Sequence, residues 1–198
     1  MKVIVGCEFS QIVTKAFRDR GHEAYSCDIL PTEGNPDWHI QGDILTHLNE
    51  NWDMAIFHPP CTYLTVTANR AFLNNPDRWK KRLDAMLFVH KLMNCNIEKI
   101  CIENPVGVIS SHIRKPDQYI QPYEYGHIDS KKTGLWLKNL PLLIPTEIVT
   151  PEWISDKSGE RYSKTHWYCS STNNPENAKT RSRTYIGIAE AMADQWNF

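Results

Sequence analysis

The stretch "MAIFHPPC", residues 54–61, joins an apolar run directly to two prolines and a cysteine. Residues 54–57 predict a buried strand, because a short apolar run bounded by turn residues is typical of one. Pro59 and Pro60 have no N–H to donate to a neighbouring strand, so the strand must end there. Cys61 is therefore expected on a stiff turn just past the strand. In an open α/β sheet this is where ligands bind, outside the carboxyl ends of the strands.

The composition is that of a globular protein. The chain has 198 residues, of which 41% are hydrophobic, enough for one domain with a core and a small appended lobe. The formal net charge of −1 gives no global basic field of a nucleic-acid binder, and it leaves room only for a local basic patch. Six cysteines occur without CxxC pairs, so we expect neither a zinc site nor a small disulfide scaffold.

The amino-terminal residues "MKVIVGCEF" become polar too early for a signal peptide. No stretch approaches the ~18 consecutive apolar residues of a membrane span. We therefore expect a cytoplasmic protein with reduced thiols, without a membrane partner and without a bound metal.

Strand-like and helix-like segments alternate along the chain on both sides of residues 54–61. Strands are predicted at 2–7, 23–29, 40–45, 52–58 and 97–104, and helices at 11–21, 78–94 and 187–198. This alternation predicts an α/β fold with a mainly parallel twisted sheet, right-handed crossovers and helices on both faces. In the helix at 78–94, helical spacing places these residues on one apolar face: Trp79, Leu83, Met86, Leu87, His90 and Met93.

The regular alternation weakens after Pro105. We expect residues 1–198 to form one domain, in which residues 108–180 make a small, irregular, loop-rich lobe that contacts substrate. Residues 121–146 predict two short strands, and 155–164 and 170–182 predict mobile loops. The apolar stripe of the last helix predicts that it packs beside the first crossover helix.

Acidic residues and a cysteine follow successive predicted strands. Asp28 ends the second strand, some twenty residues after the first loop, a position that suits a pair of ribose hydroxyls. That first loop contains only Gly6 and no GxGxxG pattern. The pairing of Cys61 with Glu103 is the stronger signal. A thiolate can attack an electron-poor ring carbon, and a protonated carboxyl can hold the ring nitrogen. Methylation of cytosine at carbon 5 needs this pairing, because that carbon becomes nucleophilic only after attack at carbon 6.

Three short motifs carry a resemblance to a known family. The segments "HPPC" at 58–61, "ENP" at 103–105 and "GDI" at 42–44 resemble the "GPPCQ", "ENV" and "GDI" motifs of the DNA cytosine-5 methyltransferases. The segment "CEFSQIVTKAFRDRGHEAYSCDI" resembles small phage and bacterial proteins of this kind, which lack a large target-recognition domain. The resemblance covers residues 1–107 well, and residues 126–143 and 183–196 more loosely.

This chain departs from the family pattern at several places. Thr62 stands where the family has glutamine after the cysteine, and His58 replaces a glycine of the cysteine loop. The glycine-rich cofactor loop becomes "GCEFSQ". The segment "KTRSR" at 179–183 is a candidate substitute for the arginine-rich segment of the family.

The resemblance implies a Rossmann-like fold, an S-adenosylmethionine cofactor, and Cys61 and Glu103 as the catalytic residues. We expect Glu103 to have a raised pKa in a dry pocket, so that it can donate a proton. Cofactor contacts are expected from Gly6, Cys7, Glu8, Phe9, Asp28, Ile29, Asp43, Ile44 and Pro59. Substrate contacts are expected from His58, Pro60, Lys132, Arg181 and Arg183.

Three functions remain open at this point. The first is methylation of cytosine in nucleic acid, DNA before RNA, by a protein of a phage or its bacterial host that masks DNA from restriction. The second is methylation of a free nucleotide or an exposed RNA base. The third is a degenerate, non-catalytic nucleotide-binding or anti-defence decoy protein. Lys131, Lys132, Arg181 and Arg183 either contact phosphates or form solvated faces.

Overall fold

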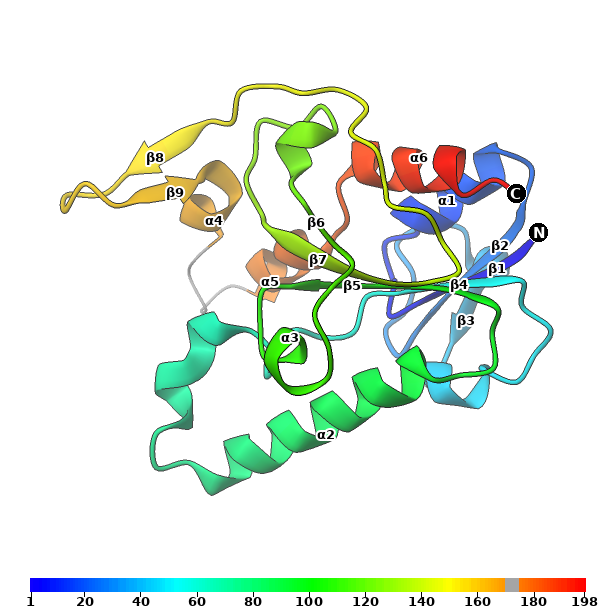
Figure 1. Cartoon of the computed structure of the whole chain (residues 1–198), viewed down its shortest axis with the longest axis horizontal. Helices are drawn as coiled ribbons and strands as arrows, with labels where there is room; N and C mark the ends of the chain where they lie inside the picture. Colours follow the sequence, from blue (N-terminus) through cyan, green and yellow to red (C-terminus); the bar gives the residue numbers. More distant parts are fainter. Residues whose placement is uncertain (170–174) are drawn as a thin grey trace.

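The fold is built on one seven-stranded sheet, seen near edge-on in Figure 1. The computed structural model describes residues 1–169 and 175–198. The strand order is β3-β2-β1-β4-β5-β7-β6. Neighbouring strands from β3 to β5 pair in parallel, and β7 runs antiparallel to both β5 and β6. The strands are β1 Lys2–Gly6, β2 Glu23–Asp28, β3 His39–Gln41, β4 Met54–Phe57, β5 Lys99–Pro105, β6 Gln118–Ile120 and β7 Thr133–Lys138.

Helices cover both faces of this sheet (Figure 1). On one face, α1 (Ile12–Asp19) and α6 (Ile186–Gln195) pack against β1 and β4 in one apolar cluster. On the other face, α2 (Pro76–Met93) and α3 (Ile109–His112) pack in a second cluster with β4 and β5. Short 3-10 helices complete the connections at η1 Pro36–Trp38, η2 Ile44–Thr46, η3 Val66–Phe72 and η4 Pro122–Glu124.

The sequence explains why the central strands are continuous apolar runs. All four residues of β4 are buried, as expected for a parallel strand with helices on both of its faces. The predicted fold class, an α/β fold with a mainly parallel sheet and helices on both faces, is confirmed. The predicted packing of the last helix beside the first crossover helix is also confirmed. Phe17 and Met192 share one cluster, and Arg20 forms an ion pair with Asp194.

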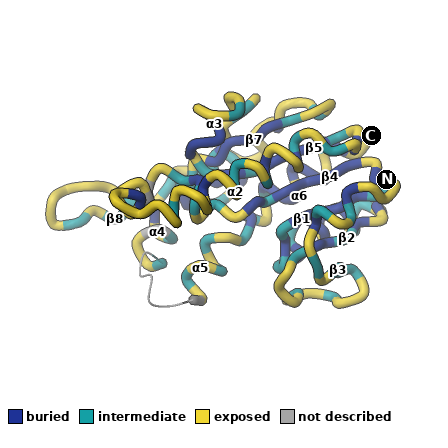
Figure 2. Tube along the Cα trace, turned by 90° about the horizontal axis from the view of Figure 1, so that it is seen from below, coloured by how far each residue is buried: buried dark blue, intermediate teal, exposed yellow. Residues whose placement is uncertain are grey.

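Residues 155–164 were expected to be a loop, and that prediction is wrong in part. The chain forms a hairpin from β8 (Trp153–Ser155) and β9 (Arg161–Ser163), followed by α4 (Lys164–Tyr168). Figure 2 shows this hairpin largely exposed. Strands of three residues carry too little periodicity to be recognised. Residues 175–182, also expected in a loop, form α5 (Pro175–Ser182); the rest of that expected loop, 170–174, lies outside the described residues.

The predicted apolar face of α2 is only partly the buried face, because Met86 and Met93 pack against the second apolar cluster. Trp79, Leu83 and Leu87 are 50%, 60% and 54% exposed, whereas Arg82 and Val89 are buried. Figure 1 shows the amino-terminal end of α2 diverging from the sheet, so this part of the helix has no apolar layer to cover. Arg82 instead donates to the carbonyl oxygen of Tyr63, 2.7 Å away, and to the side chain of Asn69. A buried, hydrogen-bonded arginine therefore stands on the face of α2 that packs inward, where the sequence pattern predicts apolar side chains.

The contact between α6 and α1 makes a first prediction. Met192 is fully buried in the cluster that joins the two helices. The variant Met192→Ala should lower the free energy of unfolding by about 2–5 kcal/mol, because it leaves a cavity. Glu190→Ala, on the exposed side of the same helix, should change it by less than about 0.5 kcal/mol. Urea unfolding of both variants measures this, and equal effects would contradict the packing.

Candidate functional site

The site lies where β4 and β5 end. Phe57, the last residue of β4, pairs with Ile102 in the parallel register of these strands, so His58, just past β4, lies beside Glu103, which is still in β5 and pairs with Leu135 of β7. The Nδ1 atom of His58 lies 2.7 Å from Oε2 of Glu103. Their side chains are only 9% and 11% exposed. A histidine just past β4 and a carboxylate near the carboxyl end of β5 therefore form a nearly buried pair at this edge of the sheet.

The pair is held in its charged form. Burial disfavours the charge on each group, but the hydrogen bond and the opposite charge of the partner outweigh it. The pKa of His58 is raised and the pKa of Glu103 is lowered as a result. The expectation of a raised Glu103 pKa is therefore wrong for the chain by itself, because that expectation did not include an imidazolium in contact with the carboxylate.

Cys61 sits on the expected turn after the two prolines. Its carbonyl oxygen accepts the N–H groups of Leu64 and Thr65, which closes the turn. The side chain of Asn104 donates to the carbonyl oxygen of Pro59 at 2.7 Å. A Cβ atom on Gly107 would lie 2.1 Å from the carbonyl oxygen of Leu64. The end of β5 and the loop after it are thus tied to the cysteine loop at two places, and only glycine permits the second contact.

The thiol of Cys61 is protonated at neutral pH. Burial raises its pKa, and the nearby charge of Glu103 adds to this rise. The positive charges of Lys131 and Arg181 act in the opposite direction without cancelling it. Attack by this sulfur therefore requires that its proton first leaves.

Lys131 is the positively charged residue that acts on all three groups of the site. Its charge lowers the pKa values of Cys61, His58 and Glu103. Its Nζ atom donates to the carbonyl oxygen of Arg181, 2.9 Å away, near the carboxyl end of α5. The neighbouring residue, Lys132, for which the sequence predicts a substrate contact, is exposed, and its ammonium lies 4.5 Å from the ring centre of Tyr119.

The other expected substrate residues are divided between two places. Arg181 is half-buried and acts electrostatically on Cys61. Pro60 is exposed beside the cysteine. Arg183 instead forms an ion pair with Glu33, at 2.7 Å, in the loop that follows β2. Arg183 is therefore already engaged by a carboxylate near the expected cofactor loop.

The loop between β1 and α1 has the geometry expected of a cofactor loop, without its glycines. Cys7 and Gln11 adopt left-handed backbone conformations, with φ values of 60° and 59°. Within the described part of the chain, the N–H groups of residues 9–12 donate to no protein acceptor. The carbonyl oxygen of Phe9 accepts from the N–H of Glu33. The loop thus presents open donors beside the carboxyl end of β1.

Glu8 does not direct its carboxylate toward this loop. The carboxylate is buried and accepts the N–H groups of Val13 and Thr14 and the hydroxyl of Thr14. It satisfies the amino terminus of α1, where a negative charge is favourable. Only the backbone of Glu8 remains for a cofactor.

The acidic residues at the ends of β2 and β3 differ in availability. Asp28 is half-buried and accepts from the N–H of Leu30, and Ile29 beside it is highly exposed. The carboxylate of Asp43 caps η2 by accepting from the N–H of Leu45. The side chain of Ile44 is buried in the core, where a Cβ on Gly6 would meet it at 2.8 Å. Asp28 and Ile29 are therefore the accessible side chains of this set.

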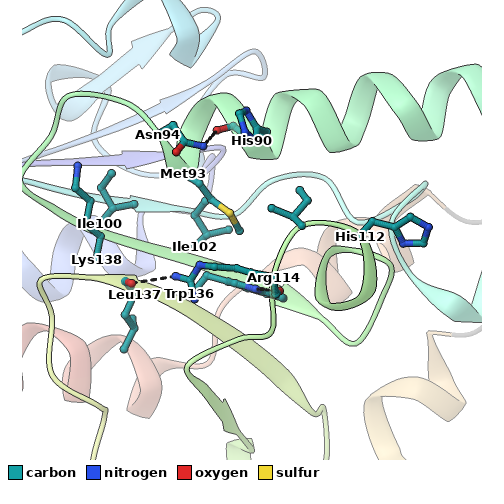
Figure 3. Close-up of a pocket in the computed structure, with 11 residues that line it drawn as sticks. His90, Met93, Asn94, Ile100, Ile102, His112, Arg114, Trp136, Leu137 and Lys138 are labelled. Atoms are coloured by element: carbon teal, nitrogen blue, oxygen red, sulfur yellow. Dashed lines mark hydrogen bonds between the residues drawn. The ribbon is translucent and has the colours of Figure 1, made fainter.

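A cavity of about 440 Å³ lies elsewhere, between the end of α2, β5, α3 and β7 (Figure 3). None of the predicted site residues lines it. Its two permanent cations are already engaged: Arg114 donates to the carbonyl oxygen of Leu137, and Lys138 to that of Ile97. This cavity therefore does not compete with the strand ends as the candidate site.

Comparison with known proteins does not identify the function of this chain. No protein-family model matches the chain, and none of the curated proteins matches it. One similar solved structure is a protein encoded within an E. coli prophage and provisionally described as a DNA modification methyltransferase. It is 15% identical with a TM-score of 0.47, and 75% of this chain aligns with 51% of that one. The chain thus spans about half the length of that structure, and the likeness is too distant to carry an argument about function.

Residues 1–169 and 175–198 contain neither a membrane-spanning helix nor a cluster of metal ligands. No helix there is long and apolar enough to cross a membrane. No group of three or more His, Cys, Asp or Glu side chains there is arranged to hold a metal ion.

The buried pair makes stability depend on pH in both directions. The contribution of His58 is present below its ordinary pKa of 6.5 and is lost as the pH rises through its raised value. The contribution of Glu103 is present above its ordinary pKa of 4.5 and is lost as the pH falls through its lowered value. Unfolding measured across pH should show both losses. The double variant His58→Asn/Glu103→Gln should lack them, whereas His47→Asn, which breaks a more exposed pair, should keep them. An unchanged profile in the double variant would contradict the charged pair.

Proposed function

We propose that this chain is an S-adenosylmethionine-dependent methyltransferase that acts on carbon 5 of cytosine in nucleic acid, DNA before RNA, through a covalent bond to Cys61. The fold alone does not decide function. The observation that carries the proposal is the placement of Cys61 just beyond β4 and of Glu103 near the carboxyl end of the neighbouring strand β5. The same cation, Lys131, acts on both groups.

The residues beyond β1 and β2 fit the proposed cofactor. S-adenosylmethionine, when bound, supplies an electrophilic methyl group for ring carbon 5. The open N–H groups of residues 9–12 would bind its carboxylate, because hydrogen-bond donors at a helix amino terminus favour an anion. The carboxylate of Asp28 would accept hydrogen bonds from the ribose hydroxyls. The exposed side chain of Ile29 would cover one face of the adenine.

The remaining chemistry belongs to the chain's own side chains. The Cys61 thiol loses its proton to water, and the sulfur forms a bond to carbon 6 of the ring. The electron pair of the 5,6 double bond moves into the ring, and ring nitrogen 3 takes up a proton. After carbon 5 is methylated, water removes the proton from carbon 5 and the sulfur–carbon bond breaks, which regenerates the double bond. Lys131 favours the thiolate, because a nearby positive charge stabilises it.

The nucleophile can be tested by separating turnover from cofactor binding. Cys61→Ala should lose methyl transfer, because no covalent adduct can form, and it should keep its affinity for S-adenosylmethionine. The control is Cys95→Ala, which removes a half-buried thiol of the segment after α2. Methyl transfer from labelled cofactor measures the rate, and calorimetry measures binding. Full activity of Cys61→Ala would refute the covalent mechanism.

The substrate class can be tested by trapping the adduct. A 5-fluorocytosine ring has no removable proton at carbon 5, so the bond to Cys61 should persist and appear as a mass shift of the protein. DNA, RNA and a free nucleotide, each carrying this base, are compared as separate arms. A shift with DNA supports the proposal, and a shift with the nucleotide alone replaces nucleic acid with a small substrate.

The cofactor position can be tested at Asp28. Asp28→Ala should weaken S-adenosylmethionine binding by about tenfold to a hundredfold, the usual value of 1.5–3 kcal/mol for a hydrogen bond to a charged group. Asp37→Ala, an exposed acid in η1, should leave the affinity unchanged. Calorimetry on both variants decides this, and equal affinities would place the ribose elsewhere.

A further inference from the structure

The charge state of Glu103 poses a question for the proposed reaction. Ring nitrogen 3 must gain a proton as the sulfur attacks carbon 6, and Glu103 is placed to hold that nitrogen. Yet Glu103 is ionised, since its carboxylate accepts a hydrogen bond from His58 at 2.7 Å. The proton that nitrogen 3 of the cytosine needs is therefore on the imidazole of His58 and not on the carboxyl group of Glu103.

We propose that His58 is the positioning residue that orients Glu103 and supplies the proton that Glu103 passes to ring nitrogen 3. This inference rests on the proposed function. It assigns a role to a side chain that contacts Glu103 and need not touch the substrate itself.

Among the described residues, the imidazole of His58 has one hydrogen-bond partner to which it can pass a proton. The side chain is 9% exposed, and its Nδ1 atom faces Glu103. Its other ring nitrogen, Nε2, is buried and finds no hydrogen-bond partner among the described residues. An unpaired buried donor costs free energy, so a ring placed only for stability would be expected to satisfy both nitrogens. The arrangement favours transfer through Nδ1 to the carboxylate.

The charged groups around the ring come from three elements. Glu103 of β5 and Glu8 of the β1–α1 loop favour the imidazolium, and Lys131, just before β7, opposes it. The net effect is a raised pKa, so the ring carries its proton near neutral pH. Histidine is the side chain that most readily gains and loses a proton in the physiological pH range, which suits transfer and recovery within a turnover.

The step balances without another reactant. The thiolate of Cys61 forms the bond to carbon 6, and the electron pair of the 5,6 double bond moves into the ring. His58 gives the proton on Nδ1 to Glu103, and the neutral carboxyl of Glu103 donates a proton to ring nitrogen 3. His58 is left as neutral imidazole and Glu103 as carboxylate. When nitrogen 3 releases its proton in the elimination, the proton returns through Glu103 to His58.

The experiment measures the pH dependence of methyl transfer in four proteins: the wild type, His58→Asn, Glu103→Gln and the control His47→Asn. In the wild type, kcat should rise with pH as Cys61 loses its proton, and fall as the pH rises through the raised pKa of His58. His58→Asn should lose about 100-fold in kcat and should lack the fall at high pH. His47→Asn should keep the wild-type profile.

Nuclear magnetic resonance provides a readout that does not depend on turnover. In protein labelled with nitrogen-15 histidine, one ring should titrate above the ordinary range, disappear in His58→Asn and titrate lower in Glu103→Gln. A wild type that transfers methyl groups while His58→Asn keeps its full rate and pH profile would overturn this inference alone. A wild type that transfers no methyl group at any pH would overturn the proposed function, and the inference with it.

Discussion

The parallel pairing of β4 with β5 is the constraint on which the rest of the site depends. Adjacent strands lie about 4.8 Å apart, and Phe57 stands opposite Ile102. His58, just past β4, and Glu103, near the carboxyl end of β5, therefore lie at the same edge, whatever the loops beyond do. Asn104 of β5 and Gly107 after it fix the loop that carries Cys61. A rigid sheet thus sets the geometry of side chains that stand on irregular backbone.

Because the His58–Glu103 ion pair is buried, its presence needs a reason other than stability. A buried ion pair adds little to stability, because the cost of removing two charges from water nearly cancels their attraction. The pair here also leaves Nε2 of His58 without a partner in the described chain. A packed apolar pair at the same place would serve the fold at least as well. Stability therefore gives no reason for these two residues, and the proposed proton transfer would give one.

The sequence predicts some parts of this arrangement better than others. The strand at 54–57, its end at Pro59 and the position of Glu103 follow from local rules, since apolar runs and proline act on their own neighbours. The contact between His58 and Glu103 depends on which strands pair, and no local pattern encodes that. The electrostatic action of Lys131 on the site depends on the direction of one side chain just before β7. The sequence does not predict which apolar residues of α2 are buried, because helical periodicity does not tell where the helix meets a sheet.

The loop after β1 shows how a motif can be absent while its geometry is kept. Left-handed backbone costs a non-glycine residue roughly 1–2 kcal/mol, and this loop contains two such residues, Cys7 and Gln11. Contacts over-determine both conformations. Glu8 is bound to the amino terminus of α1, and Gln11 donates to Ser26 and to the carbonyl oxygen of Asn35. Strain held in this way at a strand end is characteristic of binding sites. The missing glycines therefore weaken the sequence signal without arguing against a cofactor, because the backbone shape that glycine would permit is imposed by hydrogen bonds.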